Sequence, residues 1–522
     1  MYTLRAPDST TLLLYGGLSL SWSILISWLF HRRKSKIPAI PGTSGLIRSY
    51  LGALRFLYQA REIISLGYNY DHDGVFRLSR VSRWEYLVIG KKRVLEVASA
   101  PGHVLSLDEG LRDALQSDYT MGPETTINPY HIDVVRGALT RNLGRCFPRV
   151  CDEIVHAFDD VLELHNKEWK LVQVFPALNK IVARTTSRLF VDLPLCRDPD
   201  YLTLCIDNTM DIFIWGTVIN LLPGVLKPIL APLISKRKRN LRRALKFLGP
   251  MIDERVKQDN EYGSDWSDRP NDLISWLLNV AHGEERMTPI LTQRILTLYA
   301  VSIQTSSMTL TSALYDLVTY PEHILPMREE AERVVVAQGW TKAALGNMHK
   351  IDSFLRESMR MSSQIIGLMR KVIAKDGFKF SDGKTIPYGS FICVPMAAAQ
   401  LDPENYDNAE VFDGFRFARQ REEQSSGVVG DRDTREGPRA FTRHMVTTGF
   451  DHVVFGHGQH ACPGRFFAAT ELKAMLAHIL INYDIKAEND TRPPDIRMAE
   501  ATLPNPWGKI WIRKRESPGW LE

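Results

Sequence analysis

The feature that constrains this chain most is a glycine-rich turn around one cysteine, Phe455-Gly456-His457-Gly458-Gln459-His460-Ala461-Cys462-Pro463-Gly464, followed by a helix-forming run. A thiolate at the start of a helix gains from the helix dipole and from unpaired amide donors, which lower its pKa and prepare it to ligate a metal. Gly458 and Gly464 permit a tight turn with close backbone approach to a flat group. Phe455 is placed to shield the sulfur, and His460 to meet an anionic group at the edge of a bound cofactor.

The turn by itself leaves three interpretations open. In the first, Cys462 is the metal-ligating thiolate just described. In the second, His452, His457, His460 and Cys462 form a zinc site, although structural zinc usually draws on paired cysteines and none is nearby. In the third, Cys462 is a buried core thiol, the commonest fate of a single cysteine.

The pattern F-x-x-G-x-H-x-C-x-G resembles the haem-binding loop of cytochrome P450 enzymes, with His460 where most members carry arginine. By that resemblance Cys462 is the proximal thiolate ligand of the iron in haem b, a ligand type that favours O–O cleavage. Phe455, Gly458, Gly464 and His460 are then cofactor-binding residues. The resemblance implies the cytochrome P450 fold, mainly α with small β-sheets and a single N-terminal transmembrane anchor helix.

Length and composition set broad limits on the class of protein. A chain of 522 residues and 59.4 kDa forms either two domains or one large enzyme fold. The balance of 65 Lys+Arg against 60 Asp+Glu, a net charge of +5, is too weak to argue for nucleic acid. The six cysteines show no Cys-x-x-Cys pair, which fits a reduced cytosolic environment.

The N-terminus differs in composition from the rest of the chain. Residues 11–30 carry no charge and are long enough for a helix to span the hydrocarbon layer, and the basic run HRRKSK follows at 31–36. The positive-inside rule keeps that run cytosolic, whereas the charge of a cleaved signal peptide precedes its shorter apolar core. We therefore expect a membrane anchor with a basic flank over 1–36, a proline hinge over 37–42 and a haem-thiolate catalytic domain over 43–522. This layout resembles members of the family in the endoplasmic reticulum.

Beyond the hinge the apolar pattern is mostly helical, with short strands. The predicted helices cover residues 150–164, 250–258, 272–281, 291–319 and 324–338; the predicted strands cover 75–78, 86–90, 378–380, 391–394 and 509–513. Residues 218–234 are apolar but broken by prolines, so they form either a surface patch that enters the membrane interface or a buried loop. The basic run 235–243 fits a solvated helix face near anionic lipid, and residues 421–439 fit a surface loop.

Two segments predict a structural support for the cysteine loop. Glu357 and Arg360 stand at i and i+3 in DSFLRESMR, which resembles the E-x-x-R helix of the family. FDGFRF resembles its partner segment and places Arg416 as the third member of a buried Glu–Arg–Arg network. A buried carboxylate between two guanidinium groups satisfies its oxygens, and removal of either side leaves an unpaired charge.

The segment 296–307, LTLYAVSIQTSS, resembles the oxygen-activating helix of the family, whose pattern is A-G-x-D/E-T-T. Thr305 and Ser306 match the hydroxyl pair, while Ser302 and Gln304 depart from the small residue and the acid. Glutamine orients a water but donates no titratable proton, so proton delivery would rest on Thr305 and ordered water. The alternative is that these are ordinary helix hydroxyls bonded to the preceding turn.

Arg136 and Arg370 stand where the family often supplies cations to the haem propionates, together with His460. Surface arginines are common, so position alone does not assign them. The resemblance places haem between the helix that holds Thr305 and the helix that follows Cys462. The substrate pocket would then draw on residues 110–125, 205–225, 299–306, 363–369 and 502–503.

Anchor, hinge, and the motifs of the body occur in the order that a microsomal P450 monooxygenase shows. The resemblance implies electrons from NADPH through NADPH-cytochrome P450 reductase, with cytochrome b5 as an additional donor, an apolar small-molecule substrate, contact with membrane lipid and no nucleic acid. The motifs look most like the fungal branch that tailors terpenoids and indole diterpenoids. Three alternatives remain: a haem-thiolate isomerase or dehydratase, a non-catalytic haem sensor and a membrane-tethered zinc-binding adaptor.

Overall fold

The computed structural model describes residues 37–516 apart from 42, 44–45, 81–82, 165–166, 265, 426–442 and 490. The predicted anchor and its basic flank over 1–36 lie outside the described residues. Most of the predicted hinge is described: Ala39 forms a parallel bridge with Arg77, and Ile40 N donates to Arg77 O at 3.1 Å. The chain therefore enters the body beside the first strand of the main sheet.

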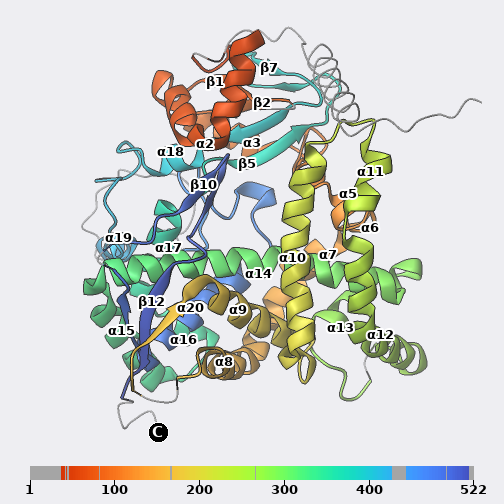
Figure 1. Ribbon diagram of the computed structural model, residues 1–522, viewed down its shortest axis with the longest axis vertical. Helices are drawn as coiled ribbons and strands as arrows, with labels where there is room; N and C mark the ends of the chain where they lie inside the picture. The colour runs from red at the N-terminus through yellow and green to blue at the C-terminus, as the bar shows by residue number, and fades with distance from the viewer. Residues whose placement is uncertain are drawn as a thin grey trace, which may run out of the picture.

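A helical body surrounds one long central helix, α14 (Thr288–Thr319), which crosses the molecule in Figure 1. The main helices in contact with α14 are α9 (Val174–Phe190), α10 (Pro199–Asn220), α12 (Arg237–Tyr262), α17 (His349–Met361) and α20 (Arg465–Asn482). The helix α8 (Thr140–Leu162) packs against α9 and α20. The body thus places α14 between the elements that carry the predicted cofactor loop and those that carry the predicted substrate pocket.

The burial of α14 depends on how its many hydroxyl groups are satisfied. Thr297 Oγ1 donates to Gln293 O, Ser302 Oγ to Leu298 O and Thr311 Oγ1 to Ser307 O, at 2.7–3.0 Å. A Ser or Thr that bonds the carbonyl four residues earlier pairs its hydroxyl within its own helix. A helix rich in Ser and Thr can therefore lie in the core without unpaired hydroxyls at these positions.

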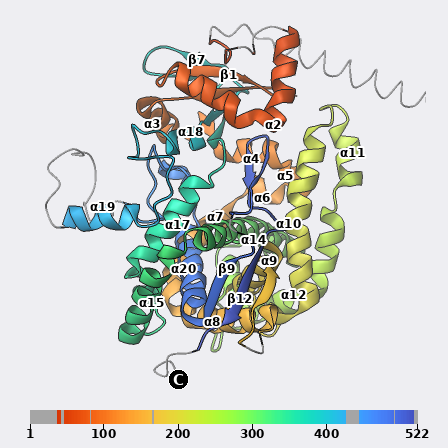
Figure 2. The ribbon, with the colours of Figure 1, turned by 60° about the vertical axis from the view of Figure 1, so that its left-hand side comes forward.

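Two sheets flank the helical body. The larger has the order β1-β2-β8-β5-β3, in which β1 and β2 form an antiparallel hairpin and β2 pairs with β8 in parallel. Its strands are β1 (Val75–Ser79), β2 (Trp84–Val88), β8 (Phe391–Val394), β5 (Gly367–Val372) and β3 (Leu105–Ser106). The helix α2 (Leu46–Tyr70) lies beside this sheet at one end of the molecule (Figure 2). The smaller antiparallel sheet joins β4 (Lys170–Gln173), β12 (Lys509–Lys514) and β9 (Tyr483–Ala487).

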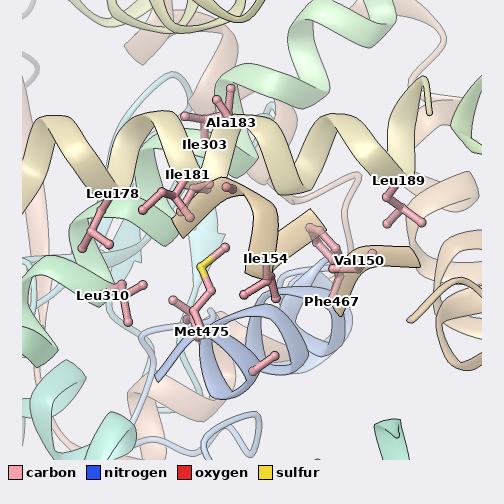
Figure 3. Close-up of a cluster of buried hydrophobic side chains, with 14 of the residues drawn as sticks. Val150, Ile154, Leu178, Ile181, Ala183, Leu189, Ile303, Leu310, Phe467 and Met475 are labelled. Atoms are coloured by element: carbon pink, nitrogen blue, oxygen red, sulfur yellow. The ribbon is translucent and has the colours of Figure 1, made fainter. Parts of the chain in front are cut away.

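The core between α8, α9, α14 and α20 is apolar (Figure 3). Met475 of α20 points into the space between Ile154 of α8, Ile181 of α9 and Leu310 of α14, whereas Phe467 of α20 lies beside Val150 of α8; all six are buried. Each fully buried side chain of this kind contributes about 1.5–3 kcal/mol of transfer free energy. This layer fixes the helix that begins at the cysteine loop against the central helix.

The remaining elements are short. The helices are α3 (Lys91–Ser99), α4 (Leu107–Leu115), α5 (Ser117–Thr120), α6 (Glu124–Ile127), α7 (Tyr130–Val134), α11 (Lys227–Ile234), α13 (Leu273–Leu278), α15 (Ile324–Gln338), α16 (Lys342–Gly346), α18 (Met396–Gln400) and α19 (Arg416–Ser425), with a π-helical turn at Val135–Leu139 and 3₁₀ turns at Leu195–Arg197, Gly283–Arg286, Pro321–His323 and Gly458–His460. Two further strand pairs join β6 (Phe378–Lys379) to β7 (Thr385–Ile386) and β10 (Ile496–Met498) to β11 (Ala501–Leu503).

The mainly helical prediction with small sheets is confirmed, with some changes of boundary. The predicted helix 324–338 and the strand 391–394 coincide with α15 and β8, whereas the predicted strand 86–90 begins two residues earlier because Trp84 pairs with Ser79. The prediction of a loop at 421–439 is wrong at its start, since residues 421–425 complete α19. The remaining predicted loop, residues 426–439, lies outside the described residues.

The apolar segment 218–234 forms the end of α10 and the helix α11. Val225 is 79% exposed and Leu233 is 77% exposed, so the surface alternative describes it and the buried loop does not. The basic run that follows opens α12. In the part of the chain that the structure describes, α10 alone is long and apolar enough to cross a membrane, and 39% of its apolar window is buried inside the protein.

Candidate active site

The cysteine loop is closed by backbone contacts just before α20. Cys462 N donates to Phe455 O at 2.7 Å. Gly458 has a φ of +68°, and a Cβ there would lie 2.7 Å from Ala98 O of α3. Left-handed backbone and a neighbouring carbonyl at that distance leave room for glycine only. The loop is therefore fixed both to its own start and to α3.

Two opposing effects act on the pKa of the Cys462 thiol. Burial raises the pKa of the thiol, whereas hydrogen bonds from the backbone N–H groups of Gly464 and Arg465, and the charge of Arg465, lower it. These N–H groups lie where α20 begins, so the helix start faces the sulfur. A cation bound at the sulfur would add the missing stabilisation of the thiolate.

Three basic side chains converge beside the loop. Arg370 of β5 is buried, its Nη1 donates to Met369 O at 2.9 Å, and its Nε and Nη2 have no partner among the described residues. Burial lowers the pKa of Arg370 to about 10. Burial also lowers the pKa of His460, and the charges of Arg370 and Arg136 act in the same direction.

The buried Nε2 of His460 is likewise without a partner in the described part of the chain, and Arg136 is exposed and pairs with Asp133 at 3.0 Å. Asp108 lies near enough to Arg370 and His460 to oppose these shifts in pKa. Buried donors without partners require an acceptor. The structure therefore brings together Arg370, Arg136 and His460, the three basic residues predicted from the sequence, and the unpartnered nitrogens of Arg370 and His460 suit an anionic group.

A stripe of α14 is exposed in the middle of an otherwise buried helix. Val301 is 48% exposed, Thr305 is exposed at the following i+4 position, and Thr309, one turn further, is half-buried. Thr305 Oγ1 donates to Val301 O at 2.9 Å, so this hydroxyl is bonded to the preceding turn and still offers its lone pairs. The helix is α-helical throughout Thr288–Thr319.

The structure separates the other two residues predicted on this helix. Ser306 is buried on the side of α9 and α20, away from the exposed stripe. Gln304 is half-buried, and its Oε1 has no partner among the described residues. Tyr299, which the predicted pocket included, is fully buried and bonded to Tyr201 and Ser187 in the core.

The predicted Glu–Arg–Arg residues form one buried cluster. Glu357 accepts from Arg360 at 2.7 and 2.8 Å, from Arg416 Nε at 3.2 Å and from Asp413 N at 3.0 Å. Arg360 also donates to Gln400 O and Ala409 O, both at 2.6 Å. The carboxylate thus holds two guanidinium groups that in turn bind the carbonyls of residues 400–411.

Sequence reasoning missed two residues that connect this helix to the cysteine loop. Arg356 Nη1 donates to His444 O and, at 3.0 Å, to Thr447 O, in the segment that leads to the loop. Asp352 accepts from Lys473 Nζ of α20 at 2.9 Å and from Met445 N at 3.1 Å. Their one signal in the sequence is that Asp352 and Arg356 stand four residues apart and so share a helix face, which ordinary surface charges also do.

An apolar wall closes one side of the exposed stripe. Met121, Ile212 and Ala300 form a small buried cluster, with Leu115 packed against it. A roof segment, residues 107–127, is fastened to α10: Gln116 Nε2 donates to Asn220 Oδ1 at 2.7 Å, and Asn220 Nδ2 donates to Ala114 O at 2.6 Å. A Cβ at Gly216 would lie 2.7 Å from Leu115 O, so α10 and the roof segment are in backbone contact there.

The zinc alternative has no geometric support in the loop. Among the described residues, the His, Cys, Asp and Glu side chains that come close enough to share an ion are His72, Asp402 and Glu404, which lie outside it. His457 Nδ1 lies 3.0 Å from Thr448 Oγ1 instead. The geometry around Cys462 is that of one sulfur with basic side chains nearby.

Comparison with known proteins decides the family. The family model described as Cytochrome P450 matches residues 133–510, a span that includes α14, the Glu357 cluster and the cysteine loop.

The chain belongs to the cytochrome P450 family.

Its relatives extend over almost the whole chain. Cytochrome P450 monooxygenase 151 of Postia placenta is 38% identical over 500 residues, which are 95% of this chain and 97% of the relative. Ent-kaurene oxidase P450-4 of Gibberella fujikuroi is 29% identical over 504 residues, 94% of this chain and 96% of that protein. The structure of retinoic acid bound cyanobacterial CYP120A1 matches with a TM-score of 0.66 and 17% identity, over 92% of this chain and all of that one, which shows the shared fold.

This P450 is accordingly a haem b monooxygenase that binds a small-molecule substrate and receives electrons from a redox partner, as its family does. The residues present fit the cofactor. A lone sulfur faces a helix start, buried Arg370 and His460 donors without partners suit anionic propionates, and the exposed stripe of α14 offers an open face. The histidine at 460 replaces the usual arginine but supplies a ring donor at the same place.

Proposed function

We propose that this P450 oxidises an apolar secondary metabolite, of the terpenoid or indole-diterpenoid class, with O₂ and electrons from NADPH. The observation that carries the proposal is the exposed stripe of α14 beside an apolar wall, with Thr305 as its central polar group. Apolar walls select a ligand by shape and area, and few polar groups fix its orientation. The relative named ent-kaurene oxidase supports a terpenoid substrate class.

In this proposal Cys462 would ligate the haem iron, in the loop formed by Phe455, Gly458 and Gly464. His460, Arg136 and Arg370 would bind the propionates, because all three are basic side chains that meet at one place. The bound haem supplies the activation of O₂ and the oxidation of the substrate.

The chain's own residues would position the reactants and exclude bulk water. Thr305 offers lone pairs toward the site while its hydroxyl proton is held by Val301 O, and Gln304 presents an amide oxygen to a water. Glu357, Arg360 and Arg416 keep residues 400–413 in place and act structurally. The roof segment keeps bulk water from the apolar wall.

We also propose that the enzyme is a single-pass protein of the endoplasmic reticulum membrane, anchored by residues 1–36 with its catalytic domain in the cytosol. Exposed Leu221, Val225, Ile229 and Leu233 lie next to the basic start of α12, an arrangement that suits an anionic lipid surface. The cytosolic side is where NADPH-cytochrome P450 reductase, with cytochrome b5 as an additional donor, would reach it.

The test is a reduced-plus-carbon-monoxide difference spectrum of the expressed membrane fraction. We expect the Soret band of a thiolate-ligated ferrous carbonyl in the wild type and in a Cys151→Ser control, and its loss in Cys462→Ser. A folded protein that gives no such band despite a supply of haem refutes the proposal. Conversion of a terpenoid panel with reductase and NADPH then tests the substrate class.

One observation favours a second candidate function, that of a haem-thiolate isomerase or dehydratase. Gln304 stands where the family's pattern has an acid, and a haem-thiolate isomerase or dehydratase needs no delivered protons from such an acid. Product formation that continues without NADPH would favour this second function. Strict dependence on NADPH and O₂ would favour the monooxygenase.

A further inference from the structure

A surface pocket with a volume of about 240 Å³ lies where the end of α2, the start of α3 and the segment after α18 meet. The helices α2 and α18 are in contact at the same end of the molecule (Figure 1). The wall also includes Phe450, Asp451 and Val453, in the segment that leads to the cysteine loop. The pocket thus joins distant parts of the chain: Tyr68 and Asp402 of its wall are 334 residues apart in sequence.

Three side chains of this wall are possible metal ligands. His72 follows α2, and Asp402 and Glu404 follow α18. One imidazole nitrogen and two carboxylate oxygens, one atom from each residue, lie within 4.8 Å of one another. Two ligand atoms at about 2.1 Å from a tetrahedral Zn²⁺ lie about 3.4 Å apart, so the outermost pair must approach by up to about 1.4 Å. Because His72 and Glu404 are exposed, rotation of their side chains can supply that movement.

The buried ligand, Asp402, is held in place by its neighbours. Its Oδ1 accepts from Glu404 N at 2.8 Å, and its Oδ2 accepts from the Tyr68 hydroxyl. Burial, and then the hydrogen bond to Asp402, raise the pKa of Tyr68, so its hydroxyl remains the donor. The Tyr68 ring also meets the His72 ring edge-on, with the centroids 4.8 Å apart. A carboxylate oxygen has a second lone pair, so Asp402 Oδ2 can bind an ion while Tyr68 fixes its orientation.

The charge of the pocket wall suits a divalent cation. Asp402, Glu404 and Asp451 supply three carboxylates, and the basic side chains of the wall are Lys91 and His72. Lys91 holds its ammonium group over an aromatic ring, 4.6 Å from the ring centre, and forms no ion pair among the described residues. His72 Nδ1 lies 3.8 Å from Asp402 Oδ2 and is a cation only when protonated. With a neutral imidazole the wall keeps an excess of two negative charges around the buried carboxylate, which needs compensation.

We propose that His72, Asp402 and Glu404 form a binding site for Zn²⁺. An imidazole nitrogen and carboxylate oxygens are ligands that zinc takes in proteins, and three protein ligands leave the fourth tetrahedral position to water. The residues of the pocket wall lie outside α14 and the cysteine loop, and the site does not rest on the proposed function. The ion joins the end of α2 to the segment after α18 and stabilises the folded enzyme, because the unfolded chain does not bring the three ligands together.

The first experiment measures zinc binding directly. The untagged, haem-loaded full chain is freed of other metals with a chelator, dialysed and titrated with ZnCl₂ in a calorimeter, for the wild type, His72→Ala and Glu404→Gln. The matched controls are His282→Ala and Glu284→Gln, since both residues are exposed and lie outside the pocket. We expect one high-affinity zinc per chain, an affinity about tenfold or more lower in both pocket variants, and wild-type affinity in both controls.

Two further measurements locate the ion and test its effect. Diffraction at the zinc absorption edge, from a crystal soaked in ZnCl₂, should place an anomalous peak between the three ligand atoms. Zinc at 100 times its dissociation constant should lower the unfolding equilibrium constant about 100-fold in the wild type and in the controls, and His72→Ala should not respond. Tyr68→Phe, which keeps all three ligands and removes one outer hydrogen bond, should weaken zinc binding less than His72→Ala does.

Equal zinc affinity in the wild type and in both pocket variants overturns the proposal, as does an anomalous peak elsewhere in place of one at the pocket. A wild type that is folded but does not bind zinc also overturns it, and His72 then acts only as an ion-pair partner of Asp402. The two pocket variants change exposed side chains, so the test does not require a substitution of the buried Asp402. The carbon monoxide spectrum tests the proposed function separately, because its result has no bearing on whether zinc binds.

Discussion

Replacement of Glu357 by glutamine should strongly destabilise the enzyme. The side chain is fully buried and accepts from two guanidinium groups and the N–H of Asp413. Glutamine has one acceptor oxygen in place of two and carries no charge, so it leaves at least one guanidinium group, Arg360 or Arg416, without its counter-charge. Removing one partner of a buried ion pair costs about 3–5 kcal/mol.

That loss is large compared with the total stability of an ordinary domain, about 5–15 kcal/mol. It is also directed at one region, because the two guanidinium groups bind carbonyls of Gln400, Ala409 and Val411. We therefore expect a lower denaturation midpoint and a smaller fraction of haem-loaded protein on expression. The lost fraction should exceed that of a variant with an equal change at the surface.

The assay is urea unfolding followed by tryptophan fluorescence and by the Soret absorbance. The control is Glu516→Gln, which removes an exposed partner of Lys167 and should leave the midpoint unchanged. The reasoning is refuted if Glu357→Gln and Glu516→Gln unfold at the same urea concentration with the same haem content. Recovery in a double variant, Glu357→Gln with Arg416→Gln, would further identify the unpaired charge as the cause.

Further outcomes follow from single contacts. Gly458→Ala should lose haem during gel filtration, since its Cβ meets Ala98 O in a left-handed backbone, while Gly102→Ala, with nothing within 4 Å, should not. Arg370→Leu should release haem to a scavenger protein faster than Arg370→Lys, which keeps a cation. Because burial raises the folded pKa of Glu471, on α20, to about 7, above its unfolded value near 4.5, folded protein binds more protons between these pH values and stability falls as the pH rises. Relative to Glu471→Gln, the wild type should lose about 3 kcal/mol of unfolding free energy between pH 4.5 and pH 7, and parallel pH profiles would contradict this.

Local patterns in the sequence predicted the elements that depend on local physics. Alternation and turn residues located β8 to the residue, and apolar spacing located α15 in the same way. The turn of the cysteine loop was predictable because Gly456 and Gly458 take a positive φ that favours glycine. Gly464 has a φ of −87° and room for a Cβ, so the structure does not require glycine there. The family resemblance supplied the order of the motifs and the place of Glu357, Arg360 and Arg416.

Contacts between distant segments were not predictable in this way. Nothing in the sequence near Thr185, Ser306 or Glu471 shows that α9, α14 and α20 bring them together, since each is an ordinary residue of its own helix. Arg356 and Asp352 were missed for the same reason: their partners, at 444–447 and Lys473, lie about 90 and 121 residues away. The side of α14 that Tyr299 occupies also depends on packing against α9 and α10, which periodicity alone does not assign.

The hydrogen bond between the Gln116 and Asn220 side-chain amides limits how the substrate pocket can be enlarged. Substitution of the wall residues by smaller ones would not move the roof segment away from α10, because the two backbones are in contact at Gly216 and Leu115. A laboratory search for activity on bulkier compounds should therefore find its useful substitutions at 116, 216 and 220 before it finds them among the residues that touch the compound. The range of substrates that this enzyme accepts therefore depends on the backbone contact between α10 and the roof segment.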